Sequence, residues 1–106
     1  MAQKVLLIED DAAFRKAVAD VLVREGYSVS EAATGKAGAA KALEESPDLI
    51  VLDLVLPGIG GIEVCQRLKQ DLRTASIPVL ILTGNDHEGQ DVACLDMGAD
   101  DYLTKP

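Results

Sequence analysis

The sequence has few of the residues that form disulfides, transition-metal sites and aromatic clusters. It contains no Trp, one His and two Cys in 106 residues, and aromatic residues make up only 3%. The single histidine, His87, excludes a His-rich metal centre. Cys65 and Cys94 lie far apart, with no CxxC spacing. We therefore expect ordinary buried thiols rather than a disulfide or a metal site.

Long apolar runs are also absent. The longest is Leu49–Leu52, which continues past Asp53 as Leu54–Leu56, whereas a membrane helix needs about 20 apolar residues. At the N-terminus, the short apolar segment Val5–Ile8 runs at once into acidic residues, which is not the pattern of a signal peptide. These features predict a cytoplasmic protein without a membrane partner.

Positive charge is scarce. The chain has 10 Lys and Arg against 18 Asp and Glu, which gives a formal charge of −8. This balance argues against direct contact with nucleic acid and against binding to an anionic membrane, because both depend on a surplus of basic residues. With 48% hydrophobic residues, the chain is expected to form one domain with a core, and most of the charge serves solubility.

Short apolar runs alternate with helical patterns along the whole chain. Strands are expected at Val5–Ile8, Ser28–Glu31, Leu49–Asp53, Pro78–Thr83 and Asp101–Thr104. Helices are expected between them, with apolar faces at Phe14, Ala17, Val18, Val21 and Leu22 in the first and at Val64, Cys65, Leu68 and Leu72 in the third. Asp11 and Thr34 are candidate caps of the first and second helices, and Asn85 or Asp86 of a fourth helix that ends at Gly98.

This alternation predicts an α/β fold with a doubly wound, five-stranded parallel sheet and helices on both faces. In such sheets, binding sites form beyond the carboxyl ends of the strands, where the strand order reverses. The residues at those ends are therefore the first candidates for a functional site.

Acidic residues follow two of the expected strands. Glu9 and Asp10 follow the first strand, and Asp53 closes the third. Carboxylates brought together repel one another unless a cation lies between them, and an all-oxygen ligand set suits Mg²⁺. The fourth strand ends in Thr83, and Lys105 follows the fifth. An aspartate nucleophile with a cation, a hydroxyl and a lysine favours phosphoryl transfer. Each residue alone has an ordinary structural explanation, and for Asp11 helix capping is preferred.

The chain resembles the receiver domain of two-component response regulators. The resemblance covers residues 1–106 and is carried by four motifs in the same order and spacing: Leu7–Asp11, Asp48–Gly58, Pro78–Gly84 and Gly98–Pro106. It implies a flavodoxin-like sheet with strand order 2-1-3-4-5. It also implies a phosphorelay switch rather than a turnover enzyme.

The resemblance also implies a role for each matching residue. Asp53 matches the phosphoacceptor that forms an aspartyl phosphate. Glu9, Asp10, Asp53 and the backbone carbonyl of Val55 match the ligands of Mg²⁺. Thr83 and Lys105 match the hydroxyl and the lysine that contact the phosphoryl group, and Tyr102 matches the switch aromatic that responds to Thr83. The implied partner is a histidine kinase or a histidine phosphotransfer protein.

The sequence departs from the family pattern in two places. Gly60 replaces an acidic residue that the family often has in the loop after the phosphoacceptor. The chain also stops at Pro106, before the fifth helix of a receiver. A receiver truncated at that point would leave apolar sheet uncovered, and we would expect a homodimer or a dimer with swapped elements.

Two other functions compete with the phosphoacceptor switch. A phosphatase of the haloacid-dehalogenase type also uses an Asp after a strand, but it requires a second acid two residues later, where this chain has Val55. A binding module could keep the fold without using phosphate. Nucleotide binding is disfavoured because neither GxGxxG nor GxxxxGK[ST] occurs.

Overall fold

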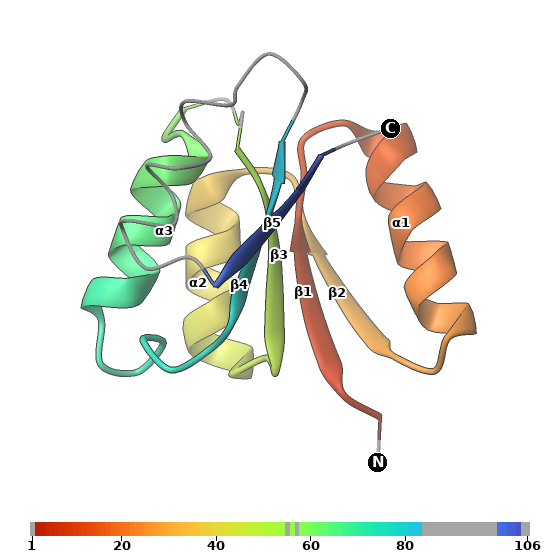
Figure 1. Cartoon of the computed structure of the whole chain (residues 1–106), viewed down its shortest axis with the longest axis horizontal. Coiled ribbons are helices and arrows are strands. Elements are labelled where there is room, and N and C mark those ends of the chain that lie inside the picture. Colours follow the sequence, from red (N-terminus) through yellow and green to blue (C-terminus); the bar gives the residue numbers. More distant parts are fainter. Residues whose placement is uncertain (1, 55, 57, 84–99, 105–106) are drawn as a thin grey trace.

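A parallel β-sheet forms the centre of the computed structural model, with helices on both of its faces (Figure 1). The structure describes residues 2–54, 56, 58–83 and 100–104, with only the backbone at 83 and 102–104. The strands are β1 (Lys4–Ile8), β2 (Ser28–Ala32), β3 (Leu49–Asp53), β4 (Val79–Thr83) and β5 (Asp101–Thr104). The helices in the described part are α1 (Ala12–Arg24), α2 (Gly35–Glu45) and α3 (Gly61–Gln70).

The sheet order is β2-β1-β3-β4-β5, and every neighbouring pair is parallel. The predicted α/β class, the parallel sheet and its strand order are therefore confirmed. Three strand boundaries differ by one residue from the prediction: β1 begins at Lys4, β2 extends to Ala32 and β4 begins after Pro78. The helix predicted between Asn85 or Asp86 and Gly98 lies outside the described residues.

The larger core cluster lies between the sheet and helices α2 and α3. It joins strand residues such as Leu6, Ile50 and Ile81 to Val64 and Cys65 of α3, all fully buried. Cys65 is a free thiol, and burial raises its pKa. This confirms the prediction of an ordinary buried thiol for Cys65, whereas Cys94 and His87 lie outside the described residues.

Helix α3 is shorter than its apolar pattern predicts. Val64, Cys65 and Leu68 are buried as expected, but Leu72 is 95% exposed because α3 ends at Gln70. Asp71 leaves the helix with an extended ψ of 122°, and its carboxylate accepts hydrogen bonds from the backbone and guanidinium of Arg73. This local turn competes with helix continuation, so the prediction for Leu72 is wrong.

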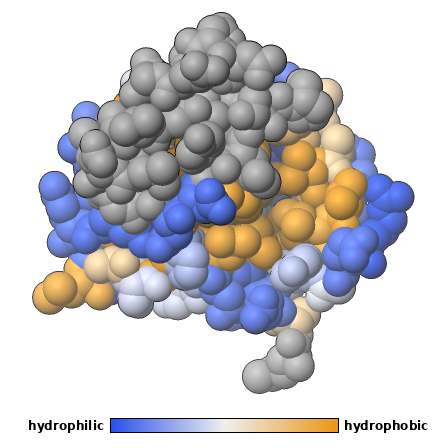
Figure 2. Space-filling model, in the orientation of Figure 1, coloured by the Kyte–Doolittle hydropathy of each residue, from blue (hydrophilic) through white to orange (hydrophobic). Residues whose placement is uncertain are grey.

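Helix α1 packs alone, among the described helices, on the opposite face of the sheet (Figure 1). Its buried face is rotated from the predicted one: Ala19 is buried, whereas Ala17 is exposed and Val21 is 49% exposed. The contacts to the second core cluster come from Phe14, Val18 and Leu22, which stay half-buried. Apolar residues accordingly show on the surface beside α1 (Figure 2).

The predicted caps of the first two helices are present. The Asp11 carboxylate accepts the backbone N–H of Phe14 at 3.1 Å, and Thr34 Oγ1 accepts that of Ala37 at 3.1 Å. Each cap satisfies an amide that the helix itself leaves without a partner. Within the described ranges, none of the helices has the length and apolar character of a transmembrane segment.

Lys69 and Asp100 tie α3 to the amino ends of β4 and β5. Lys69 Nζ donates to the carbonyl of Ile77 at 2.8 Å and to Asp100 Oδ2 at 3.1 Å. The same Asp100 oxygen accepts the backbone N–H of Val79 at 2.8 Å. Partial burial pushes the Asp100 pKa upward, but the Val79 hydrogen bond and the Lys69 ammonium outweigh it and hold the pKa below its ordinary value.

We predict that Asp100→Asn destabilises the protein at neutral pH, by on the order of 1 kcal/mol, because the charged hydrogen bonds are lost. A lowered folded-state pKa stabilises above the unfolded pKa of about 4, and this contribution is lost as pH falls through the folded value. Urea unfolding at pH 7 and pH 3 measures the difference between wild type and variant, which should shrink at pH 3.

Asp20→Asn is the matched control, because Asp20 pairs with Lys16 on the exposed side of α1 at 3.8 Å. Such exposed pairs contribute little at any pH. If Asp100→Asn lowers the free energy of unfolding equally at pH 7 and pH 3, the stabilisation does not come from the ionised Asp100 carboxylate.

Candidate functional site

The carboxyl ends of β1 and β3 place Glu9 and Asp53 next to each other. The two strands are neighbours, with Ile8 paired to Leu52. Glu9 follows Ile8 and is fully buried, and Asp53 closes β3 with 4% exposure. Continuous apolar runs bury these two strands on both faces, so the acids that end them emerge at one edge of the sheet.

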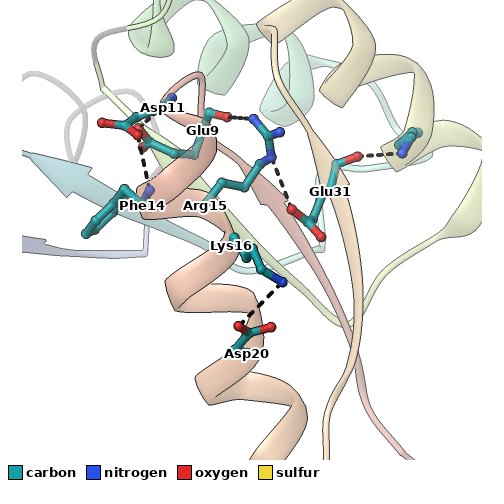
Figure 3. Close-up of polar contacts among 8 residues, drawn as sticks. Glu9, Asp11, Phe14, Arg15, Lys16, Asp20 and Glu31 are labelled. Carbon is teal, nitrogen blue, oxygen red and sulfur yellow. Dashed lines mark hydrogen bonds and ion pairs between the residues drawn. The ribbon is translucent and has the colours of Figure 1, made fainter.

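The turn after β1 is fixed on several sides. The Glu9 N–H donates to the carbonyl of Ala32 at 3.0 Å, and Glu9 Oε1 accepts the N–H of Asp11 at 3.2 Å. Asp11 in turn caps α1, as the close-up shows (Figure 3). This confirms that Asp11 acts as the helix cap, and it leaves Asp10 exposed between two anchored neighbours.

Three carboxylates converge at this edge. One oxygen each of Glu9, Asp10 and Asp53 lie within 4.8 Å of one another. At an effective dielectric constant of about 20, each pair of charges at that separation repels by on the order of 3 kcal/mol. Positive charge placed among the three carboxylates offsets this repulsion.

The donor set fits Mg²⁺. All three groups offer carboxylate oxygens, and no sulfur or imidazole ligand joins the cluster among the described residues. Mg²⁺ is usually held by one or two carboxylates and keeps several of its waters, through which a further acid can act. Glu9 and Asp53 are buried at the site, whereas Asp10 is exposed to water.

The other predicted site residues are described only in part. Asp53 pairs with Leu82, and Thr83 is the next residue and the last of β4. Thr83 pairs with Thr104 of β5, and Tyr102 pairs with Ile81. The Thr83 backbone therefore lies on the strand beside β3, and the Tyr102 backbone lies one strand further, on β5. Val55 and Lys105 fall outside the described residues.

Gly61 allows α3 to begin directly against the end of β3. A Cβ atom at this position would lie within 2.7 Å of the Leu54 Cα and closer still to the carbonyl oxygen of Asp53. The Gly61 N–H also donates to the carbonyl of Leu54 at 2.9 Å. Because these neighbours are backbone atoms, they cannot turn aside, and any larger residue must displace the segment that carries Asp53.

Sequence reasoning missed Arg15. Its Nη1 donates to the carbonyl oxygen of Glu9 at 2.8 Å, and its Nε pairs with Glu31 Oε1 at 3.1 Å. Charged residues in a helical pattern are normally assigned to the solvent face, so the pattern alone does not point to Arg15. The one available signal was its place one turn after the cap Asp11, where a long side chain reaches back toward the preceding strand.

Comparison with known proteins agrees with this geometry. A family profile described as "Response regulator receiver domain" matches residues 5–106. The chain belongs to the response regulator receiver domain family. Receiver domains are phosphoacceptor signalling domains, which are generally not enzymes in the usual sense.

The curated relatives are longer proteins. The chain is 48% identical over 103 residues to the DNA-binding dual master transcriptional regulator RpaA of Synechocystis sp., covering 97% of this chain and 43% of that protein. It is 40% identical over 106 residues to the phosphate regulon transcriptional regulatory protein PhoB of Pseudomonas aeruginosa, covering all of this chain and 46% of that one. The receiver chain thus spans less than half of these relatives.

Solved structures show the same fold. A response regulator from Chloroflexus aurantiacus superposes with a TM-score of 0.95 at 33% identity, covering all of this chain and 87% of that one. The receiver domain of a sensor histidine kinase from Pseudomonas aeruginosa superposes with a TM-score of 0.91 at 29% identity, covering all of this chain and 87% of that one. That structure is described as having a magnesium ion in its active site cleft.

We predict that Gly61→Ala destabilises the domain by about 1–3 kcal/mol, the usual range for overpacking. It should also slow any reaction at Asp53, because its Cβ meets the backbone of Asp53 and Leu54. Urea unfolding measures the first effect, and labelling with a small phosphodonor measures the second.

Gly60→Ser is the matched control. Gly60 has an extended backbone with φ of −71°, and a Cβ there meets nothing within 4 Å. A serine at this N-cap position should leave stability unchanged or slightly increased. If Gly61→Ala and Gly60→Ser lower the stability and the labelling rate equally, the close approach at Gly61 does not explain the effect of Gly61→Ala.

Proposed function

We propose that this receiver domain is a Mg²⁺-dependent phosphoacceptor switch in which Asp53 receives a phosphoryl group from a phosphohistidine. The observation that carries the proposal is the convergence of the buried Asp53 with Glu9 and Asp10 within 4.8 Å. An aspartate nucleophile with two further acids beside it that can hold a metal ion suits phosphoryl transfer through an aspartyl phosphate.

In the proposed reaction, an Asp53 carboxylate oxygen attacks the phosphorus of the phosphohistidine. A P–O bond forms, the P–N bond to the imidazole breaks, and the leaving imidazole takes a proton from solvent. Glu9, Asp10 and Asp53, with the Val55 carbonyl, would hold Mg²⁺, which supplies positive charge for the transferring oxygens. The phosphodonor is a histidine kinase or a histidine phosphotransfer protein.

The response to phosphorylation is proposed to pass through β4 and β5. Thr83 ends β4 one register position beyond the partner of Asp53, and Tyr102 lies on the neighbouring strand. In the proposal, the Thr83 hydroxyl and Lys105 contact the phosphoryl group, and Tyr102 follows Thr83. A phosphoryl group that favours one arrangement by about 1–3 kcal/mol is enough to control partner binding.

Mg²⁺ should stabilise the folded protein, because a ligand that binds only the native state raises its free energy of unfolding. At 100 times the dissociation constant the gain is about 2.7 kcal/mol. Asp10→Asn should remove most of this gain, which urea unfolding with and without Mg²⁺ measures. Asp11→Asn is the control, since Asn also caps helices well and Asp11 is not one of the three converging acids. A Mg²⁺ response that survives Asp10→Asn would contradict the proposed ligand set.

Incubation with Mg²⁺ and acetyl phosphate or phosphoramidate should add one phosphoryl group to the intact protein, seen by mass spectrometry. Asp53→Asn should abolish the adduct. Asp48→Asn should keep it, because Asp48 lies at the other end of β3, where it accepts the Lys4 N–H at 2.8 Å. Steady release of phosphate from ordinary monoesters would point to a phosphatase instead, and the lack of both adduct and turnover to a binding module.

A further inference from the structure

Arg15 links Glu9, one of the three converging acids, to Glu31 of strand β2. Its side chain is only 20% exposed, although it is a charged residue in a surface helix. Nη1 donates to the carbonyl oxygen of Glu9 at 2.8 Å, and Nε donates to Glu31 Oε1 at 3.1 Å. Figure 3 shows the guanidinium between these two acceptors.

The carbonyl that Arg15 holds belongs to the peptide group that links Glu9 to Asp10. The N–H of Glu9 is fixed by Ala32, and its carboxylate is fixed by the Asp11 N–H. Arg15 supplies the contact on the Asp10 side of Glu9. The orientation of that peptide plane sets where the Asp10 backbone begins, and so where the exposed Asp10 carboxylate can reach.

The guanidinium is itself held in place. Glu31 belongs to β2, and its own backbone carbonyl accepts a hydrogen bond from Lys41 of α2. The planar fork of an arginine can satisfy two acceptors at a fixed angle, which a lysine ammonium on a flexible stem does less well. Strand β2 and helix α2 therefore fix the position from which Arg15 reaches Glu9.

We propose that Arg15 is a positioning residue for the cation site: through the Glu9–Asp10 peptide it places the Asp10 carboxylate, and Glu31 holds Arg15 in the geometry this requires. This inference rests on the proposed function, because it assigns to Arg15 a part in Mg²⁺ binding without direct contact to the ion.

A titration of the full chain with Mg²⁺ alone, followed by the amide shifts of residues 9–11 in ¹H–¹⁵N NMR spectra, tests the inference. Arg15→Ala should raise the Mg²⁺ dissociation constant about tenfold, at the low end for lost outer contacts of a metal site. Lys16→Ala is the matched control: it removes the same charge from the next residue of α1, whose ammonium pairs with Asp20 on the exposed side. It should change the constant by less than about twofold.

Two milder variants keep the test valid if Arg15→Ala fails to fold. Arg15→Lys keeps the charge but loses the fork, and should give a smaller loss of affinity than Arg15→Ala. Glu31→Gln keeps Arg15 but removes its ionic partner, and should also weaken Mg²⁺ binding. Raising Mg²⁺ to saturation should restore the phosphorylation rate of all three variants, because positioning affects occupancy of the site rather than the chemistry at Asp53.

The possible outcomes are distinct. Weaker Mg²⁺ binding by the Arg15 variants, with the Lys16→Ala constant unchanged, supports the positioning role. Equal losses for Arg15→Ala and Lys16→Ala would show that only net charge matters, and unchanged affinity in the Arg15 and Glu31 variants would show that the contacts are purely structural; either result overturns the inference. Wild-type protein that does not bind Mg²⁺ overturns the proposed function, and the inference with it.

Discussion

Mutual repulsion among three carboxylates is the constraint on which the rest of the site depends. Glu9, Asp10 and Asp53 lie within 4.8 Å of one another at the end of a parallel sheet, and two of the three are buried. Left to themselves, such groups would move apart or take up protons. The turn after β1 is accordingly anchored by a strand carbonyl, a helix-capping residue and a guanidinium. These contacts fix the turn that carries Glu9 and Asp10 beside the end of β3, which is the kind of preorganisation that metal and phosphoryl sites use.

Much of this arrangement was predictable from the sequence because it follows from topology. Parallel strands that are buried on both faces appear as continuous apolar runs. Once β1 and β3 are neighbours, the residues after Ile8 and Leu52 must meet at one edge. The caps Asp11 and Thr34 were equally predictable, because each side chain binds a backbone N–H only three residues later. Neither prediction requires knowledge of how helices pack on the sheet.

The remaining features depend on packing, which a periodic pattern does not encode. The pattern assigned Val21 to the core, yet α1 turns Ala19 and Arg15 toward the sheet instead. Ala19 is buried, and the Arg15 guanidinium, partly buried, donates to two oxygens, of Glu9 and Glu31. Leu72 continued the α3 pattern but lies beyond the turn at Asp71. The close approach at Gly61 has no sequence signal, because its contacts to the backbone of Asp53 and Leu54 involve no side chain of its own.

Different contacts hold helix α3 at the two ends of the sheet. At the amino end, Lys69 and Asp100 bind strand backbones together with charged hydrogen bonds, so that α3, β4 and β5 share one clamp. At the carboxyl end, α3 begins with no side chain between its first residue and the backbone that follows β3. The first residue of α3 therefore lies directly against the Asp53 carbonyl, whereas the last turn of the same helix is held at the other end of the sheet by the Lys69 hydrogen bonds.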